Sequence, residues 1–328
     1  MVGDVSFMPI RHPTESDIRE IGDEFHLDLS DEEVSEFKSL IVDSLDAYET
    51  IDDLGQPRRE PTRTDKRNSG YQPRKDDEYN GWITKCEVKR TDSGSLAGID
   101  VAVKDSIPVA GVRMTCGSDV LGEYVPDVDA TIVSRLLDAG ARIVGKTNMD
   151  DMALTGAGFS SAYGPTLNPR KRGYLSGGSS GGSAIVVATN EVDLAIGCDQ
   201  GGSIRTPASW SGVVGLKPTF GLVPYTGILG LETTIDYAGP MARDVKMIAR
   251  GLTVMAGNDP DDPRQPENVP EPDYEAGLAD DIEEISIGVV SEGFDQPKGE
   301  QVVNEHVRDA LYALEEKGAN VDEISIPM

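Results

Sequence analysis

The chain has 328 residues, of which 38% are apolar, and 30 basic against 58 acidic side chains give it a formal net charge of −28. Such an acidic excess argues against binding to nucleic acid or anionic membranes, whose phosphates would be repelled over most of the surface. No apolar run approaches the length of a transmembrane helix, and the first residues lack the apolar centre of a signal peptide. The three cysteines form no disulfide framework. We therefore expect a cytoplasmic protein.

The spread of the acidic residues along the whole chain indicates a salt-accumulating, halophilic cell, because a charged shell keeps a protein soluble where salt screens charge. An acidic protein of an ordinary cell is the alternative.

Two helices are predicted near the N-terminus, over residues 14–27 and 30–53. Each begins with a Ser or Thr that is followed three residues later by an acid, a pattern typical of a helix start. Residues 1–54 are therefore expected to form an N-terminal helical arm. The following segment, 55–95, opens with a Pro-, Arg- and Asp-rich stretch without periodicity, which predicts a linker or wrapping loop.

From residue 96 to 328, predicted strands alternate with predicted helices. This order is typical of an α/β fold with a mixed central β-sheet flanked by helices. The chain stops directly after a predicted strand, so we expect the domain to be incomplete at its C-terminus. The predicted strands are 96–105, 141–145, 191–197, 285–290 and 321–327, and the predicted helices are 129–139, 180–190, 244–257 and 301–317.

Three common kinds of site are disfavoured. Residues 140–147 (GARIVGKT) fit the pattern of a phosphate-binding loop, but a predicted helix precedes Gly140 and a strand-like run follows it, the reverse of what such a loop needs. The only histidines are His12, His26 and His306. None lies near the Gly- and Ser-rich middle of the chain, so a Ser-His-Asp triad has no base, and no metal-binding spacing is present.

The middle of the chain holds two Gly-Gly-Ser clusters, in 176–184 and 198–219, each next to an apolar element. Tight glycine turns bring backbone N–H groups close to a ligand, and a serine in such a turn can act as a nucleophile beside them. Without histidine, the base must be a lysine or a carboxylate. Lys104 ends a predicted strand, the place where catalytic groups converge in α/β sheets.

The stretches VAVKDSIPVAGV, SGGSSGGSA and GCDQGGSIRTPASWSGVVGLKPT resemble the amidase signature family of Ser-Ser-Lys hydrolases. The spacing agrees, since Ser179 lies 75 residues after Lys104 and 24 residues before Ser203. The resemblance implies that Ser203 is the nucleophile, that Ser179 is a bridging serine preceded by a cis peptide from Gly178, and that Lys104 is the base.

The resemblance also implies an oxyanion hole of backbone amides and a set of supporting residues, with no metal or other cofactor. The oxyanion amides would be those of Gln200, Gly201, Gly202 and Ser203, and the supporting residues would be Gly178, Ser180, Asp199 and Arg205.

Within the family, the DQGGSIR core, residues 221–228 and the helical arm resemble stand-alone bacterial amidases of nitrile and aromatic-amide degradation. This implies a small-molecule amide substrate, hydrolysis to acid and ammonia, and a homodimer formed through the N-terminal helices. One alternative is the glutamine-hydrolysing A subunit of a tRNA-dependent amidotransferase, which usually carries Thr in place of Gln200. A truncated, inactive chain is the other alternative.

Overall fold

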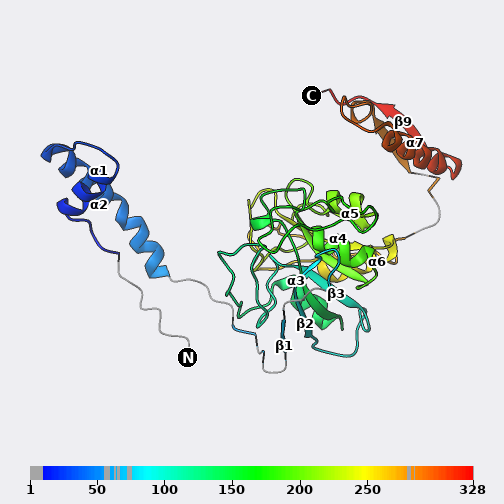
Figure 1. Ribbon diagram of the computed structural model, residues 1–328, viewed down its shortest axis with the longest axis horizontal. Helices are drawn as coiled ribbons and strands as arrows, with labels where there is room; N and C mark the ends of the chain where they lie inside the picture. The colour runs from blue at the N-terminus through cyan, green and yellow to red at the C-terminus, as the bar shows by residue number, and fades with distance from the viewer. Residues whose placement is uncertain are drawn as a thin grey trace. The chain divides into compact units, whose positions relative to one another are not determined.

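The computed structural model describes residues 10–54, 60–62, 64, 67–71, 76–278, 282–283 and 285–327. The chain divides into two compact units, one up to Glu60 and one from Pro61 onward. Each unit is described by itself below, and Figure 1 shows their elements.

The N-terminal unit is a pair of helices, α1 (Glu15–Glu24) and α2 (Asp31–Leu54). Thr14 caps α1 by accepting from the Asp17 amide, while the Asp17 carboxylate accepts from the Thr14 amide. Ser30 makes the same exchange at the start of α2. These reciprocal bonds satisfy amides that have no partner within the helix, so the two predicted helices are confirmed.

A seven-stranded mixed sheet forms the centre of the second unit, in the order β1-β2-β4-β3-β5-β7-β6. Strand β3 is parallel to β4 and β5, and the remaining pairs are antiparallel. The expected α/β fold around a mixed sheet is therefore confirmed. The strands are β1 (Asn68–Tyr71), β2 (Trp82–Val88), β3 (Asp100–Lys104), β4 (Arg142–Thr147), β5 (Leu194–Asp199), β6 (Val214–Gly215) and β7 (Tyr237–Ala242).

Helices cover both faces of this sheet (Figure 1). Val101 and Val103 of β3 belong to the main core cluster together with residues of α3 and α6. Ala102, which lies between them, packs instead with Val186 and Val187 of α4. Because side chains alternate along a strand, Lys104 lies on the same face as Ala102, the face covered by α4. The helices are α3 (Thr131–Asp138), the short η1 (Asp151–Ala153), α4 (Gly181–Ala188), α5 (Arg205–Ser211) and α6 (Val245–Met255).

The predicted strands and helices from residue 96 onward all have counterparts in the structure, but the strands β1, β2, β6 and β7, the helix α5 and the short η1 and η2 (Ser291–Gly293) were missed. The segment 55–95, expected to be a linker or wrapping loop, contains β1 and β2, and β2 pairs with β4 inside the sheet. Its apolar run is short and follows a polar, Pro-rich stretch that hides it. Helix α5 and strand β7 carry a proline and small residues, so propensity disfavours them, and only their packing against neighbouring elements explains them.

The structure also explains the apparent phosphate-binding loop. Gly140 has φ +91° and follows the end of α3, so it terminates that helix. Residues Arg142–Thr147 form strand β4. The order is helix, turn and strand, as expected, and not the strand, loop and helix of a phosphate-binding loop.

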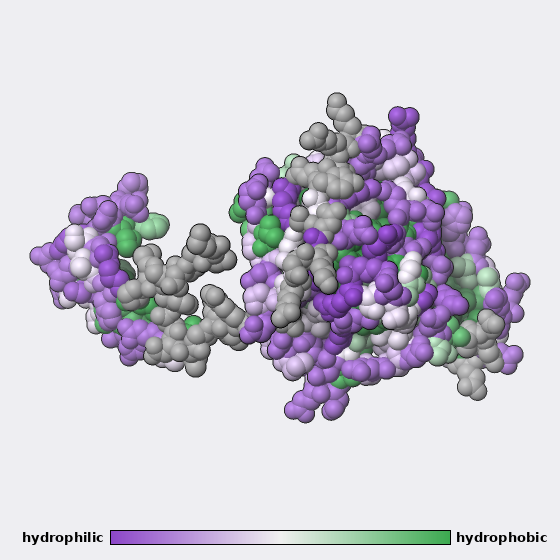
Figure 2. Space-filling model, turned by 90° about the horizontal axis from the view of Figure 1, so that it is seen from below, coloured by the Kyte–Doolittle hydropathy of each residue, from purple (hydrophilic) through white to green (hydrophobic). Residues whose placement is uncertain are grey.

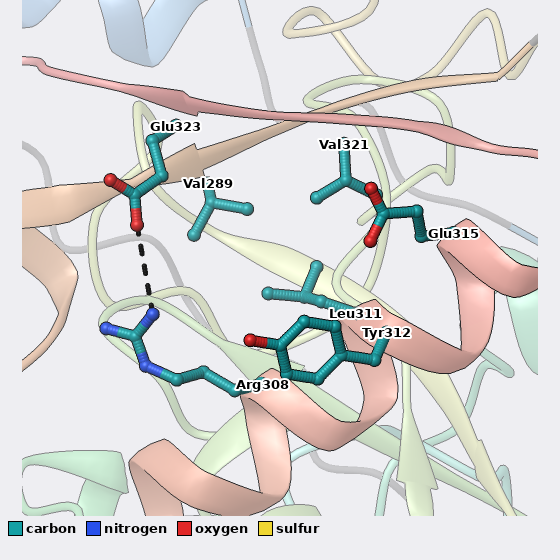
Figure 3. A pocket seen from close by; sticks show the side chains of 7 residues that line it. All are labelled: Val289, Arg308, Leu311, Tyr312, Glu315, Val321 and Glu323. Carbon is teal, nitrogen blue, oxygen red and sulfur yellow. Dashed lines mark ion pairs between the residues drawn. The ribbon is translucent and has the colours of Figure 1, made fainter.

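The C-terminal segment forms a separate two-stranded parallel sheet, β8 (Ser286–Val290) with β9 (Asn320–Ile324), joined by η2 (Ser291–Gly293) and α7 (Gln301–Glu316). A pocket lies between α7 and the strands, and apolar side chains from both line it. Figure 3 shows this pocket and, at its edge, the Arg308–Glu323 ion pair, with 3.8 Å between the charged atoms.

Hydrophilic side chains cover most of the surface visible in Figure 2, with small hydrophobic patches between them. None of the helices in the described ranges is long and apolar enough to cross a membrane. Cys86, Cys116 and Cys198 are free, buried thiols.

Candidate active site

The site is built at the carboxyl end of β3. Lys104 is the last residue of that strand, and its Nζ lies 2.7 Å from Ser179 Oγ, within a hydrogen bond. Ser179 stands just before α4, and the peptide bond that joins it to Gly178 is cis, as the resemblance implied. Both Lys104 and Ser179 are fully buried. The structure thus brings together two side chains that are 75 residues apart in the sequence.

Burial lowers the pKa of Lys104 below its ordinary value. Removing a lysine from water disfavours its charged form, and this loss of solvation outweighs the opposing effect of nearby acidic groups, first Cys198 and then Asp150. A neutral amine has a lone pair that can accept a proton. The arrangement can therefore provide a base without histidine.

Ser203 lies in the turn between β5 and α5 and is 8% exposed. Its main-chain carbonyl accepts from the Ser180 amide at 3.2 Å, which joins the two serine-bearing turns. The Ser180 side chain donates to the Cys198 carbonyl at 3.1 Å and accepts from the Cys198 amide at 3.2 Å. The Ser180 side chain therefore connects the start of α4 to strand β5.

Asp199 organises the Ser203 turn. Its carboxylate accepts from the amides of Gly202 (2.8 Å) and Ile204 (3.1 Å), and from the Arg205 guanidinium at 2.9 and 3.0 Å. Burial by itself would raise the pKa of Asp199, but these donors outweigh it and hold the pKa below its ordinary value. Asp199 is therefore a fixed negative charge around which the turn is wrapped.

The four amides expected to form an oxyanion hole are not equivalent. The Gly202 amide already donates to Asp199, so it is occupied within the protein. The amides of Gln200, Gly201 and Ser203 donate to no group in the described ranges of the chain. A Cβ placed on Gly201 would meet no atom within 4 Å, so there is open space beside this part of the turn. Of the four expected donors, Gly202 is thus the one already engaged, and the amides of Gln200, Gly201 and Ser203 remain available to a ligand.

Sequence reasoning missed Asp150, whose main chain is bonded to that of Ser179. Its amide donates to the Ser179 carbonyl at 3.2 Å, and its carboxylate accepts from the amides of Gly158 and Ser160. A Cβ on Gly178 would lie 2.1 Å from Asp150 Oδ2, so only glycine fits there. The signal was the position of Asp150 shortly after β4, at the same edge of the sheet as Lys104.

A second buried lysine was also missed. Lys146 Nζ lies 3.1 Å from Asp105 Oδ1, and both side chains are fully buried. Lys146 is opposite Val103 in the β3–β4 register, so it lies on the face away from Lys104. The other oxygen of Asp105 accepts from the amide and the hydroxyl of Thr115. The Lys146–Asp105 ion pair therefore fixes the backbone directly after Lys104, where the chain leaves β3.

Within the described part of the chain, no group of three or more His, Cys, Asp or Glu side chains could hold a metal ion.

The comparisons with known proteins point to one family. The profile of the Amidase family matches residues 82–328. The A subunit of glutamyl-tRNA(Gln) amidotransferase from Natronomonas pharaonis is 45% identical over 251 residues, covering 76% of this chain and 59% of the relative. The enantioselective amidase of Rhodococcus rhodochrous is 40% identical over 319 residues, covering 96% of this chain and 61% of the relative.

Solved structures give the same result. The A subunit of the amidotransferase from Thermotoga maritima superposes with a TM-score of 0.69 at 36% identity, covering 75% of this chain and 52% of that one. The peptide amidase of Stenotrophomonas maltophilia gives a TM-score of 0.66 at 38% identity, covering 71% and 49%. The chain spans about 60% of the length of these two curated relatives. The matched profile, the identities and the shared fold show that this chain belongs to the amidase signature family.

Proposed function

We propose that the protein hydrolyses small carboxylic amides to acid and ammonia through an acyl-enzyme on Ser203, without a metal or other cofactor. The observation that carries this proposal is the buried Lys104 amine, 2.7 Å from Ser179 Oγ and with a lowered pKa. A base of this kind is what a serine nucleophile without histidine requires.

In the proposed reaction, neutral Lys104 accepts the proton of Ser179, and Ser179 accepts the proton of Ser203. Ser203 Oγ attacks the amide carbonyl carbon, and the amides of Gly201 and Ser203 donate to the oxyanion that forms. The relay returns the proton to the leaving nitrogen, the C–N bond breaks and ammonia leaves. Water, deprotonated by the same relay, then attacks the ester and releases the acid and the Ser203 hydroxyl.

Two observations favour a stand-alone amidase, and one favours an amidotransferase subunit. The enantioselective amidase aligns with 96% of the chain, including the helical arm, whereas the Natronomonas amidotransferase subunit aligns with 76%. Gln200 also occupies the position where the amidotransferase branch usually carries Thr. Both favour a stand-alone amidase. The higher identity to the amidotransferase subunits, 45%, favours the alternative, a glutamine-hydrolysing subunit that works with partner subunits.

The test is ammonia release by the complete protein from a panel of aliphatic and aromatic primary amides and from glutamine, at several KCl concentrations. The stand-alone amidase predicts turnover of the panel without any partner. Turnover of glutamine alone, dependent on a partner subunit, would establish the alternative. No turnover of either by folded protein would refute the proposed activity. Ser203→Ala is the control for contaminating activity.

We also propose a cytoplasmic homodimer formed through α1 and α2. In support, these helices expose several large apolar side chains, and a groove between them is lined almost entirely by such residues. Burying this surface against a second copy would remove it from water. Light scattering of the complete protein and of a Leu40→Glu variant tests this. A wild-type monomer, or a variant as dimeric as wild type, would contradict it.

A further inference from the structure

The turn that bears Ser203 has a second attachment, which is made by the Gln200 side chain. Gln200 Nε2 donates to Asp236 Oδ1 at 2.8 Å and to the Tyr225 hydroxyl at 3.2 Å. Gln200 Oε1 is buried and has no hydrogen-bond partner among the described residues. The orientation of the carboxamide is nevertheless determined, because the flipped group would place its oxygen against the Asp236 carboxylate.

The acceptor of this bond is itself firmly held. Asp236 is 3% exposed and precedes β7, the antiparallel neighbour of β5. Its carboxylate also accepts from the amides of Leu231 and Glu232 at 3.1–3.2 Å. The Asp236 carbonyl accepts from Arg264 at 3.1 Å. Gln200 is therefore attached to a rigid point, and not to a mobile loop.

Gly201 lies between two attached residues, Gln200 and Gly202, and makes no side-chain contact of its own. Asp199 fixes the amides of Gly202 and Ile204, on the inner side of the turn. Gly201 carries no side chain and has open space beside it. The direction of the unoccupied Gly201 amide therefore depends on its two neighbours in the chain. One of them is Gly202, held by Asp199, and the other is Gln200, held by Asp236.

We propose that Gln200 is a positioning residue for amide hydrolysis, whose side chain, anchored on Asp236, aims the Gly201 amide at the oxyanion. This inference rests on the proposed function. Oxyanion donors act only when they are fixed before the reaction, since reorienting them during it costs the energy that they supply. The Gln200 side chain bonds to Asp236 and Tyr225 and to no member of the proposed relay, so its effect is expected on the transition state and not on substrate binding.

The first test compares Gln200→Leu with wild type in the complete protein, using the best amide from the panel. Loss of a whole oxyanion donor costs about 10²–10³-fold in kcat, and a donor that is loosened but present should cost less. We expect kcat to fall about 10–100-fold while KM changes less than about threefold. Gln265→Leu is the matched control, because this carboxamide bonds to the Gly221 and Gly257 carbonyls, away from the turn. Its kcat should stay within twofold of wild type.

The second test removes Asp236, the acceptor of the Gln200 side chain. In Asp236→Leu the anchor is lost, so kcat should fall as in Gln200→Leu, and the double variant should be no slower than either single variant. Hydrogen exchange at the amides of 200–203 should quicken in Gln200→Leu and not in Gln265→Leu. An active wild type with Gln200→Leu within twofold of its kcat, or additive losses in the double variant, would overturn this inference alone. A wild type that hydrolyses no amide would overturn it together with the proposed function.

Discussion

Replacing Lys146 by methionine should destabilise the fold strongly, although Lys146 belongs neither to the serine turns nor to the proposed proton relay. The substitution keeps most of the side-chain volume and removes the charge. It leaves the Asp105 carboxylate fully buried, and among the described residues its remaining donors are the amide and the hydroxyl of Thr115. An ion deprived of its partner in the interior keeps the cost of losing water without the attraction that offset it.

The size of the effect follows from the geometry. At 3.1 Å the attraction between the two charges is about 5 kcal/mol for an effective dielectric constant of 20. Breaking a buried pair from one side costs about 3–5 kcal/mol in measured cases. For a unit of this size, that corresponds to a fall in the melting temperature of roughly 6–20 °C.

Thermal unfolding followed by circular dichroism, at one fixed high KCl concentration, measures this shift. Lys85→Met is the matched control, because Lys85 pairs with Glu191 at 3.2 Å but both side chains are 36% exposed. That surface pair should contribute less than about 1 kcal/mol. Adding Asp105→Asn to Lys146→Met should restore part of the loss, since no buried charge then lacks a partner. A Lys146→Met melting temperature within 2 °C of wild type, or equal to that of Lys85→Met, would refute this reasoning.

Four further predictions concern the site and the surface. Ser203→Ala should lower kcat at least about 10⁴-fold and leave the melting temperature unchanged, and ammonia release with a melting curve checks both. Because only neutral Lys104 can accept a proton, kcat/KM should rise with pH through the lowered pKa of Lys104. Lys104→Ala should lose about 10²–10⁴-fold in rate, and a near-normal rate of this variant would exclude Lys104 as the base. The unfolded state binds the Lys104 proton up to about pH 10.4, whereas the folded state binds it only up to the lowered pKa of Lys104. Lys104→Met should therefore be more stable than wild type at low pH. This difference in stability should shrink as pH rises between those two pKa values, which melting curves at several pH values measure. The net charge of −28 should make the protein lose structure below a few tenths molar salt, beginning with α1 and α2, and a melting temperature that stays flat or falls with KCl would contradict a salt adaptation.

The sequence by itself determined most of the second unit's architecture. Amphipathic periodicity and glycine stops placed α3, α6, α7 and strands β3, β4 and β5, because these elements carry apolar patterns of their own. It also determined which residues to consider for the chemistry, since long, specific motifs carry Lys104, Ser179 and Ser203. Helix α5 and strand β7 escaped, because each carries a proline and small residues and is stabilised by neighbours that are distant in sequence.

Only the tertiary structure decided which polar groups are free and which are already used. The sequence treats the four amides of 200–203 alike, but the fold turns the Asp199 carboxylate toward Gly202 and occupies its amide. The sequence likewise does not show on which face of the sheet Lys104 and Lys146 lie. Pleating places them on opposite faces of the sheet, one beside Ser179 and the other beside Asp105. Whether a buried lysine lies against a hydroxyl or a carboxylate depends on strand register, which is fixed by the packing of the whole sheet and not by local sequence.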